Sequence, residues 1–428
     1  MSSELPYKIL DADNHFNEPL TLYQDFIDPS KRDLAITYEE DSSGRMMQLF
    51  AGKPSKFTVE GFSEGIAEVQ LSQGLDARVD TSVEQDGFRL PGRLLNRLNP
   101  LRGLSEEEKR EVIAEFRHQS EAFGNRELRL ALMDEQGIEA ALMYPASAHD
   151  IEYEFADDVE AMYANIRAFN RWIYEAIGYA HDNRMFLPPY LSLADVDMAQ
   201  RELEVLIETG APMLQIKSGH AHGGRAHPFG GRSPADPIFD PIWSRVNETG
   251  MRLCVHLGAT DYQKYGADWS ENPDLTFGQF SNFQWMMYWG DRPALELTAG
   301  LILQNFFGRF PNIKVCLSEM GAVWVPYCVR KMDHSYMLGR RSAFGKLDRR
   351  PSQIFREHFV VAPYPEENVQ RVVAEIGIEP LVFGSDFPHG EGLAYPAGYV
   401  ESQLSSFSDR DQRRIMRDNM ADFLRLTA

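Results

Sequence analysis

Cysteine is scarce in this sequence. Its 428 residues include three cysteines, Cys254, Cys316 and Cys328, none of them close to another in the chain. An odd and sparse set argues against a disulfide framework and favours a reducing compartment, so we expect a cytoplasmic protein. Cys254 and Cys316 lie within apolar runs, which favours small buried hydrophobic residues over nucleophiles.

Long apolar runs and an excess of positive charge are also missing. No run approaches the roughly 20 apolar residues that span a bilayer. The 43 basic residues are outnumbered by 64 acidic residues, which gives a net charge of −21. Because such a surface repels phosphate backbones and anionic lipids, we expect no nucleic-acid partner and no membrane partner. We expect a small-molecule substrate instead, which can itself be acidic because the potential within a cleft can differ from the overall charge.

Short apolar runs bounded by turn residues alternate with stretches of helical periodicity. We identify eight such runs as strands: Tyr7–Ala12, Glu139–Tyr144, Phe186–Leu191, Met213–Lys217, Met251–His256, Ile313–Ser318, His358–Val361 and Leu381–Gly384. Strands that are apolar throughout are typical of a parallel sheet covered on both faces. Eight β–α units in succession favour an α/β fold of the closed (β/α)8 TIM type, and no Gly-x-Gly-x-x-Gly follows the first run to favour a dinucleotide-binding sheet.

Two stretches interrupt this alternation. Residues 20–124 separate the first two strands by far more than an ordinary connection, and they include a possible hairpin of Leu34–Tyr38 with Met47–Phe50. We interpret them as an inserted lid or subdomain within a single domain of residues 1–428. The segment Leu257–Arg292 is dense in aromatic residues, which we expect to pack against the barrel or a partner subunit rather than against substrate.

Polar side chains gather where the first apolar run ends. Asp11, Asp13 and His15 alternate along an extended segment, so all three could face the same side. In a barrel of this type the C-terminal ends of the strands carry the catalytic groups. Asp13 and His15 could share a cation there, or an aspartate could cap a turn while His15 is an ordinary polar residue. Glu18, in the following loop, is a weaker candidate for a substrate contact.

The last apolar run ends in a second polar group. Asp386, His389 and Glu391 lie on one short exit loop, in which Gly390 and Gly392 permit tight turns. Asp386 could bind a metal ion and also orient or deprotonate its water. His389 and Glu391 could contact the substrate or support the ligands.

Three further strand ends carry candidates. His220 and His222 follow the fourth run in a glycine-rich loop, where one of them or neither could be a ligand. His256 ends the fifth run, and the near-neutral pKa of an imidazole suits general acid–base chemistry. Glu319 follows the sixth run and could hydrogen-bond to His256, bind substrate or begin a helix, and we favour the hydrogen bond to His256.

Together these residues resemble the amidohydrolase superfamily, specifically the branch typified by aminocarboxymuconate semialdehyde decarboxylase. That family opens with an Asp-x-His-x-His motif, and Asp11-Ala12-Asp13-Asn14-His15 is similar to it with the first histidine replaced by aspartate. The resemblance implies four metal ligands: Asp13, His15, His220 and Asp386. It also implies that His256 activates water, while Glu319 stands where the family usually has a histidine.

The resemblance implies one divalent metal ion, zinc or manganese, and a carboxylate-rich set of ligands favours manganese. Hydrolysis of a small organic substrate by a metal-activated water is our first expectation. Non-oxidative decarboxylation of an aromatic or enoic acid is the alternative. A metal-free barrel that binds a ligand without turnover is the third possibility. The resemblance and the aromatic segment also indicate a homodimer.

Overall fold

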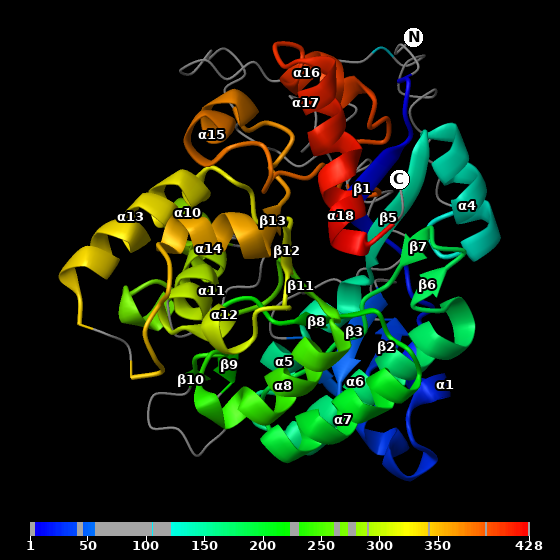
Figure 1. Cartoon of the computed structure of the whole chain (residues 1–428). Coiled ribbons are helices and arrows are strands. Elements are labelled where there is room, and N and C mark those ends of the chain that lie inside the picture. The colour runs from blue at the N-terminus through cyan, green and yellow to red at the C-terminus, as the bar shows by residue number, and fades with distance from the viewer. Residues whose placement is uncertain are drawn as a thin grey trace.

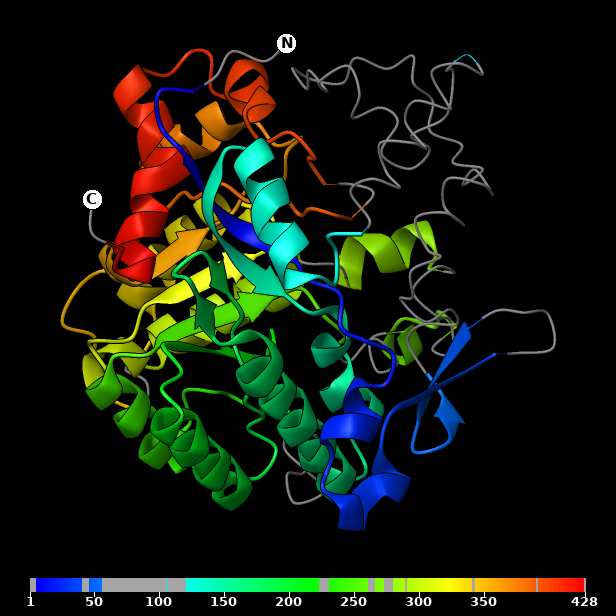
Figure 2. The same cartoon turned by 90° about the vertical axis from the view of Figure 1, so that its right-hand side faces the viewer.

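The chain is an α/β protein in which helices surround short and mostly parallel strands (Figures 1 and 2). We analysed a computed structural model that describes residues 5–40, 46–55, 105, 121–222, 231–260, 266–272, 280–288, 291–340, 343–389 and 392–426. Within these residues no helix is both long and apolar enough to cross a membrane.

Two four-stranded sheets occupy the centre, with strand orders β1-β5-β7-β6 and β13-β12-β11-β8. All neighbouring strands pair in parallel except β6, which runs antiparallel to β7. The strands of the first sheet are β1 (Ile9–His15), β5 (Ile138–Tyr144), β6 (Ala180–His181) and β7 (Met185–Phe186). Those of the second are β8 (Met213–Ile216), β11 (Arg252–His256), β12 (Val315–Ser318) and β13 (Phe359–Val361).

Each predicted apolar run except the last overlaps one of these strands. The third run, Phe186–Leu191, is a strand only at its start, because Pro188 and Pro189 have no N–H to donate to a ladder. The eighth run, Leu381–Gly384, was wrongly predicted as a regular strand. Its backbone hydrogen-bonds in turn to β13 and to β1, with Val382 N donating to Val361 O and Ala12 N donating to Phe383 O.

Isolated bridges connect the edges of the two sheets. Tyr190, which follows β7, pairs with Gln215 of β8, and Leu381 pairs with Val361 of β13. Phe387 pairs with Asn14 of β1. The third predicted run and the last run with its continuation to Phe387 therefore link the two sheets.

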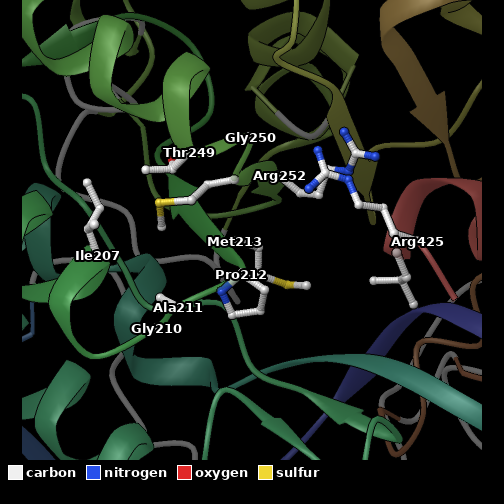
Figure 3. Close-up of a pocket in the computed structure, with 11 residues that line it drawn as sticks. Ile207, Gly210, Ala211, Pro212, Met213, Thr249, Gly250, Arg252 and Arg425 are labelled. Atoms are coloured by element: carbon white, nitrogen blue, oxygen red, sulfur yellow. The ribbon is translucent and has the colours of Figure 1, made fainter.

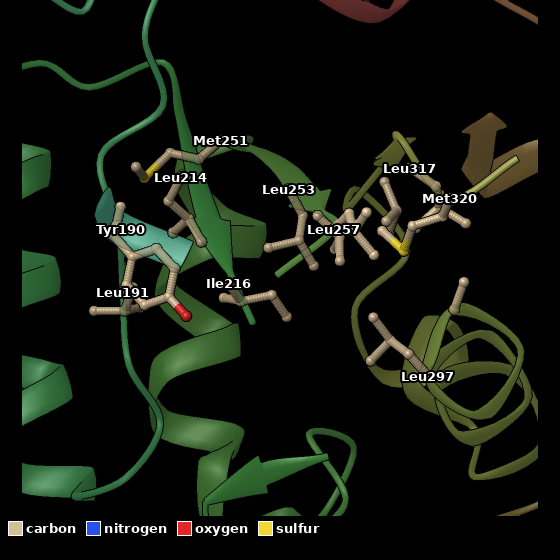
Figure 4. Packing of buried hydrophobic residues seen from close by; sticks show 14 of the residues in the cluster. Tyr190, Leu191, Leu214, Ile216, Met251, Leu253, Leu257, Leu297, Leu317 and Met320 are labelled. Carbon is tan, nitrogen blue, oxygen red and sulfur yellow. The ribbon is translucent and has the colours of Figure 1, made fainter. Parts of the chain in front are cut away.

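Two layers of buried side chains hold the strands. In β8, Leu214 and Ile216 join a large cluster between strands and helices, while Met213 joins a second, smaller cluster. Figure 4 shows the first cluster, in which Leu253 and Leu317 lie with Leu297 of a covering helix. The smaller cluster includes Cys254 and Cys316, which are buried as expected; Cys328 is buried too, and all three cysteines are free. It also includes Met420, Ala421 and Phe423 from the last helix, which therefore covers one end of the strands.

Several covering helices begin at residues whose side chains cap them. Asp195 accepts a hydrogen bond from Met198 N, and Ser408 accepts one from Asp411 N. The longer helices are α4 (Arg126–Glu135), α6 (Val159–Trp172), α7 (Val196–Glu208), α8 (Asp240–Thr249), α11 (Asp291–Leu303), α13 (Trp324–Leu338), α14 (Pro351–His358) and α15 (Val369–Ile376). The shorter ones are α1 (Leu22–Phe26), α5 (Ile151–Glu154), α10 (Asn282–Tyr288), α12 (Phe306–Arg309), α16 (Gly398–Gln403), α17 (Asp409–Arg413) and α18 (Asn419–Leu424).

The predicted hairpin forms beside the two sheets (Figure 2). Its strands are β2 (Thr37–Glu40), β3 (Met46–Phe50) and β4 (Lys53–Pro54), all antiparallel. A second small hairpin, β9 (Ala221–His222) with β10 (Gly231–Arg232), follows β8. Residues 56–104 and 106–120 of the predicted insertion lie outside the described residues, so the lid and the single domain stay predictions.

Candidate metal centre

The end of β1 places Asp13 and His15 in a buried pocket, each only 3% exposed. The Nδ1–H of His15 donates to the carbonyl of Tyr144 at 2.8 Å. This bond orients the ring and turns Nε2 toward the pocket, as in histidines that ligate metals. Burial, together with the neighbouring His389, lowers the pKa of His15 to about 3, so its imidazole is neutral and can donate a lone pair.

The exit loop after Phe383 brings Asp386 and His389 to the same pocket. Asp386 Oδ1 lies 3.1 Å from His15 Nε2 and 2.8 Å from His389 Nδ1. The rings of His15 and His389 stack with centroids 3.8 Å apart. Although burial opposes ionisation, the two imidazoles hold the pKa of Asp386 below its usual range, so this carboxylate is charged.

His256, at the end of β11, lies between two carboxylates. Its Nδ1–H donates to the carbonyl of Leu257 at 2.8 Å, and its Nε2 lies 3.1 Å from Glu319 Oε2 and 3.3 Å from Asp13 Oδ1. Burial alone would lower the pKa of His256, but Glu319 and Asp13 raise it to about 10. Both ring nitrogens face oxygen acceptors, so His256 carries two protons near neutral pH.

Glu319, after β12, joins the two groups of side chains. Burial, reinforced by Asp386, raises the pKa of Glu319 to about 8, while His256 opposes this rise. Burial also raises the pKa of Asp13. Three carboxyl groups in one dry pocket are costly to ionise unless a positive charge compensates them. The pocket therefore favours a cation.

Two overlapping sets of donor atoms each lie close enough to surround an ion. One ligand atom from each of Asp13, His15, His256 and Glu319 lies within 4.8 Å of the others. The same holds for His15, Glu319, Asp386 and His389. Carboxylate oxygens with imidazole nitrogens suit manganese or zinc. The site thus fits a divalent metal ion, and His15 and Glu319 belong to both sets. Asp13 belongs to the first set and Asp386 to the second.

The backbone at these strand ends is arranged for close approach. A Cβ at Gly384 would lie 2.6 Å from Cβ of Asp13, so only glycine allows the exit segment to lie beside β1 here. Glu319 and Asp386 both have left-handed backbones, with φ of 54° and 55°. Such conformations are uncommon for residues with a Cβ and cluster at functional sites.

Asp11 does not face the pocket with Asp13 and His15, so the prediction of a common face was wrong. A register shift in β1 between Asp11 and Asn14 breaks the alternation of side chains. Asp11 instead accepts hydrogen bonds from Asn14 Nδ2 at 3.0 Å and from Ser385 N at 2.9 Å. It thereby ties β1 to the exit loop that carries Asp386.

A buried arginine, Arg129 of α4, braces the same two segments. Its Nη2 donates to Asn14 Oδ1 and to the carbonyl of His15, the latter at 2.7 Å, and its guanidinium lies 4.7 Å above the ring of Phe387. Arg129 was not among the residues predicted from the sequence. The available signal was its position three and four residues before Leu132 and Met133, on the buried face of the helix.

The remaining predicted site residues lie elsewhere. His220 belongs to neither donor group; its Nδ1 lies 3.1 Å from the carbonyl of Ala221, and its ring packs against Gly231 of the small hairpin. Glu18 accepts a hydrogen bond from Ser147 N at 2.8 Å rather than joining the donors. Glu391 lies outside the described residues.

Comparisons with known proteins agree with this geometry. A protein-family model with the description Amidohydrolase matches residues 120–426. No curated protein matches at a significant level. An amidohydrolase from Mycobacterium avium subsp. paratuberculosis K-10 has a solved structure that is 26% identical in sequence, with a TM-score of 0.77, and the match covers 98% of this chain and 100% of that chain.

Two decarboxylases share the fold at lower identity. The 5-carboxyvanillate decarboxylase from Sphingomonas paucimobilis is 19% identical with a TM-score of 0.53, and the match covers 72% of this chain and 86% of that chain. A dihydroxybenzoic acid decarboxylase from Polaromonas sp. JS666, solved with manganese and the inhibitor 2-nitroresorcinol, is 19% identical with a TM-score of 0.53, covering 76% of this chain and 91% of that one.

Proposed function

This chain belongs to the amidohydrolase family, and from that premise we propose that it catalyses the non-oxidative decarboxylation of a small aromatic or enoic acid. The family and the buried His/Asp/Glu cluster make it a metal-dependent hydrolase or carboxy-lyase. The choice between the two reactions rests on the protonation of one side chain.

That side chain is His256. Nδ1 donates to a carbonyl, and Nε2 faces the carboxylates of Glu319 and Asp13 at 3.1 and 3.3 Å. An imidazole with acceptors on both nitrogens holds its proton and acts as an acid. Decarboxylation requires such an acid, because the carbon that loses CO2 must gain a proton. A general base, as hydrolysis requires, would need an unprotonated Nε2.

We propose a single manganese ion held by Asp13, His15 and Asp386, with Glu319 as a fourth donor. The carboxylate-rich set and the manganese of the Polaromonas decarboxylase support this choice. When bound, the divalent ion supplies positive charge that orients an anionic substrate and offsets negative charge on it.

The chain's own residues then carry the proton. His256 gives the Nε2 proton to the substrate carbon, the bond from that carbon to the carboxylate breaks, and CO2 leaves with no net electron transfer. Glu319 and Asp13 stabilise the imidazolium of His256 before the proton is transferred. After the transfer, they favour protonation of His256 for the next turnover. His256 is only 3% exposed, which keeps bulk water from competing for the proton.

Hydrolysis is the second candidate. The observation that favours it is the 26% identity to a protein identified as an amidohydrolase, against 19% for the two decarboxylases. In that case an unprotonated His256 would take a proton from water.

Turnover in D2O separates the two reactions. Purified enzyme with manganese should release CO2 from hydroxybenzoic or enoic acids and place one deuteron on the product carbon, detected by NMR. Hydrolysis of amides or esters forms no carbon–deuterium bond. Acid release from those substrates with no CO2 from any acid would contradict the proposal.

We also infer that the eight strand segments close into a (β/α)8 barrel with residues 20–124 inserted after its first strand. The bridges Tyr190–Gln215, Val361–Leu381 and Asn14–Phe387 support closure, because they join the edges of the two sheets. A lid made from the insertion and a homodimer stay predictions. Small-angle scattering and limited proteolysis with and without substrate would test both.

A further inference from the structure

A cavity of about 210 Å³ lies at the opposite ends of the strands from the metal centre. Its walls come from the loop before β8, the turn between α8 and β11, and the end of α18 (Figure 3). Arg252, in its wall, begins β11, and His256 of the metal centre ends it. Four residues of extended chain separate the two by roughly 13 Å. We call this cavity the arginine pocket.

Two guanidinium groups lie side by side at one wall of the arginine pocket (Figure 3). Arg252 Nε donates to the carbonyl of Phe423 at 2.6 Å, which anchors the side chain. Arg425 follows α18 and lies over Gly250, where a Cβ would be 2.7 Å from its Nη2. Gly250 thus leaves the room that lets the second guanidinium approach the first.

Neither guanidinium forms an ion pair with a carboxylate in the described part of the chain. Burial, followed by the charge of Arg425, lowers the pKa of Arg252 to about 10. The nearby Lys314 adds a third positive charge, and its ammonium group donates to the carbonyl of Glu357. Within the described residues these two guanidinium groups have no carboxylate partner, although the whole chain has a net charge of −21.

The other walls of the arginine pocket are largely apolar. Ile207, Pro212, Met213, Met251 and Leu424 line it. Hydrocarbon and thioether surface binds an organic body better than it binds a hydrated inorganic ion. Paired guanidinium groups bind planar carboxylates through several charge-assisted hydrogen bonds. The two kinds of wall together select an anion with a carboxylate head and a small apolar body.

We propose that the arginine pocket is a second ligand site, separate from the metal centre, that binds a small apolar carboxylate between Arg252 and Arg425. The head contacts the two guanidinium groups, and the body lies against Met213 and Met251. This site does not depend on which reaction the metal centre catalyses.

The location is tested with 4-bromobenzoate, whose bromine scatters anomalously. Crystals of the full chain soaked in this probe should show a bromine peak in the arginine pocket, on the side of Met213 and Met251. Any peak at the metal centre is resolved from it, because the two sites lie at opposite ends of the strands. Absence of a peak in the arginine pocket would overturn the proposal.

Affinity is tested by calorimetry with benzoate on the full-length protein and two variants. Arg425→Asn removes one charge and keeps a residue that tolerates the left-handed backbone, with φ of 60° here. We expect benzoate affinity for the pocket to fall by about 10-fold or more. Arg410→Asn, an exposed arginine of α17, is the matched control and should change nothing.

Two results would refute the assignment. Equal benzoate affinity in wild type and Arg425→Asn, with a bromine peak still present, would mean binding at crystal concentration only. If inorganic phosphate binds as tightly as benzoate, the apolar wall contributes no preference for a ligand with an apolar body. Arg252→Met removes the charge and keeps an unbranched side chain. If it weakens benzoate binding as Arg425→Asn does and both variants keep wild-type melting temperatures, the site is supported.

Discussion

The two ends of the parallel strands carry charged side chains in different arrangements. At the C-terminal ends, carboxylates and imidazoles alternate within hydrogen-bonding distance, as in the series His389, Asp386 and His15. At the N-terminal ends, Arg252 and Arg425 stand together with no carboxylate partner in the described part of the chain. The side chains at the first end therefore suit a cation, whereas those at the second suit an anion.

This contrast shows how one scaffold separates two kinds of chemistry. The metal centre draws its groups from the ends of β1, β11 and β12 and from the exit loop, and buried contacts hold them, so its geometry is narrowly determined. The arginine pocket has one partly buried anchor, the bond from Arg252 to Phe423, and one exposed arginine. Substitutions at the first end should therefore have far larger effects than substitutions at the second.

Asp386→Ala should have the largest effect. It removes a charged ligand that two histidines contact, so the ion should be lost together with more than about 1,000-fold of kcat/KM. Elemental analysis of the purified variant measures the metal, and a CO2-release assay measures turnover. Asp197→Ala, an exposed aspartate in the first turn of α7, is the control. A variant with full metal content would show that Asp386 is not a ligand.

His256→Asn should lower kcat by about 100- to 10,000-fold, the usual contribution of a general acid. The metal content should stay at the wild-type level, because Asp13, His15 and Asp386 remain. This pattern separates the proton donor from the ligands. Full activity in the variant would rule out the proposed role of His256 and leave the metal centre itself intact.

Arg129→Met should weaken metal binding by about 10- to 100-fold, as changes around metal ligands commonly do. The guanidinium no longer holds the carbonyl of His15, so the ligand shifts. Arg129→Lys keeps the charge but loses the planar fork, and it should restore only part of the affinity. Metal affinity is measured by competition with a chelator. An unchanged affinity in both variants, with lowered melting temperatures, would assign Arg129 to stability alone.

The pH dependence should report the acid. Decarboxylation needs the protonated form of His256, so kcat/KM should be lost as pH rises through the pKa of that group. The carboxylates raise this pKa to about 10, and a bound cation would lower it again. We therefore expect a basic limb at or below about pH 10 that falls about tenfold per pH unit. A rate that rises with pH across the same range would indicate a base and favour hydrolysis.

Arg425→Asn should have the smallest effect on catalysis. The residue lies at the far ends of the strands and is exposed, so stability should change by no more than about 0.5 kcal/mol and turnover should be unchanged. Turnover is measured without added benzoate. If Arg425→Asn lost as much activity as Arg129→Met, the two ends of the strands would be coupled. That result would contradict the proposed separation of the two sites.

Much of the metal centre could be predicted from the sequence because its residues end apolar runs. Asp13, His15, His256 and Asp386 each stand at such a point, and strand ends of one parallel array meet at one rim. Glu319 was also expected beside His256, and the two side chains lie 3.1 Å apart. These predictions needed only local patterns and the fold class.

Other features depended on details that no local pattern carries. The register shift in β1 turns Asp11 away from Asp13, and the hairpin after β8 holds His220 beside Gly231. The contribution of Glu319 to both donor groups arises from its left-handed backbone and from the distance between β12 and the exit loop. Alternation along a strand predicts a common face only where no register shift intervenes.

The sequence by itself determined the α/β class, the apolar strands and the strand ends that carry chemistry, because hydrophobic periodicity and turn residues are local properties of the chain. Only the tertiary structure decided which of those polar groups meet, that Arg129 lies beneath them, and that Arg252 and Arg425 come together. Contacts between residues more than a hundred positions apart depend on strand register and helix packing. The free energies of register and packing depend on the whole fold, so no single segment of the sequence determines them.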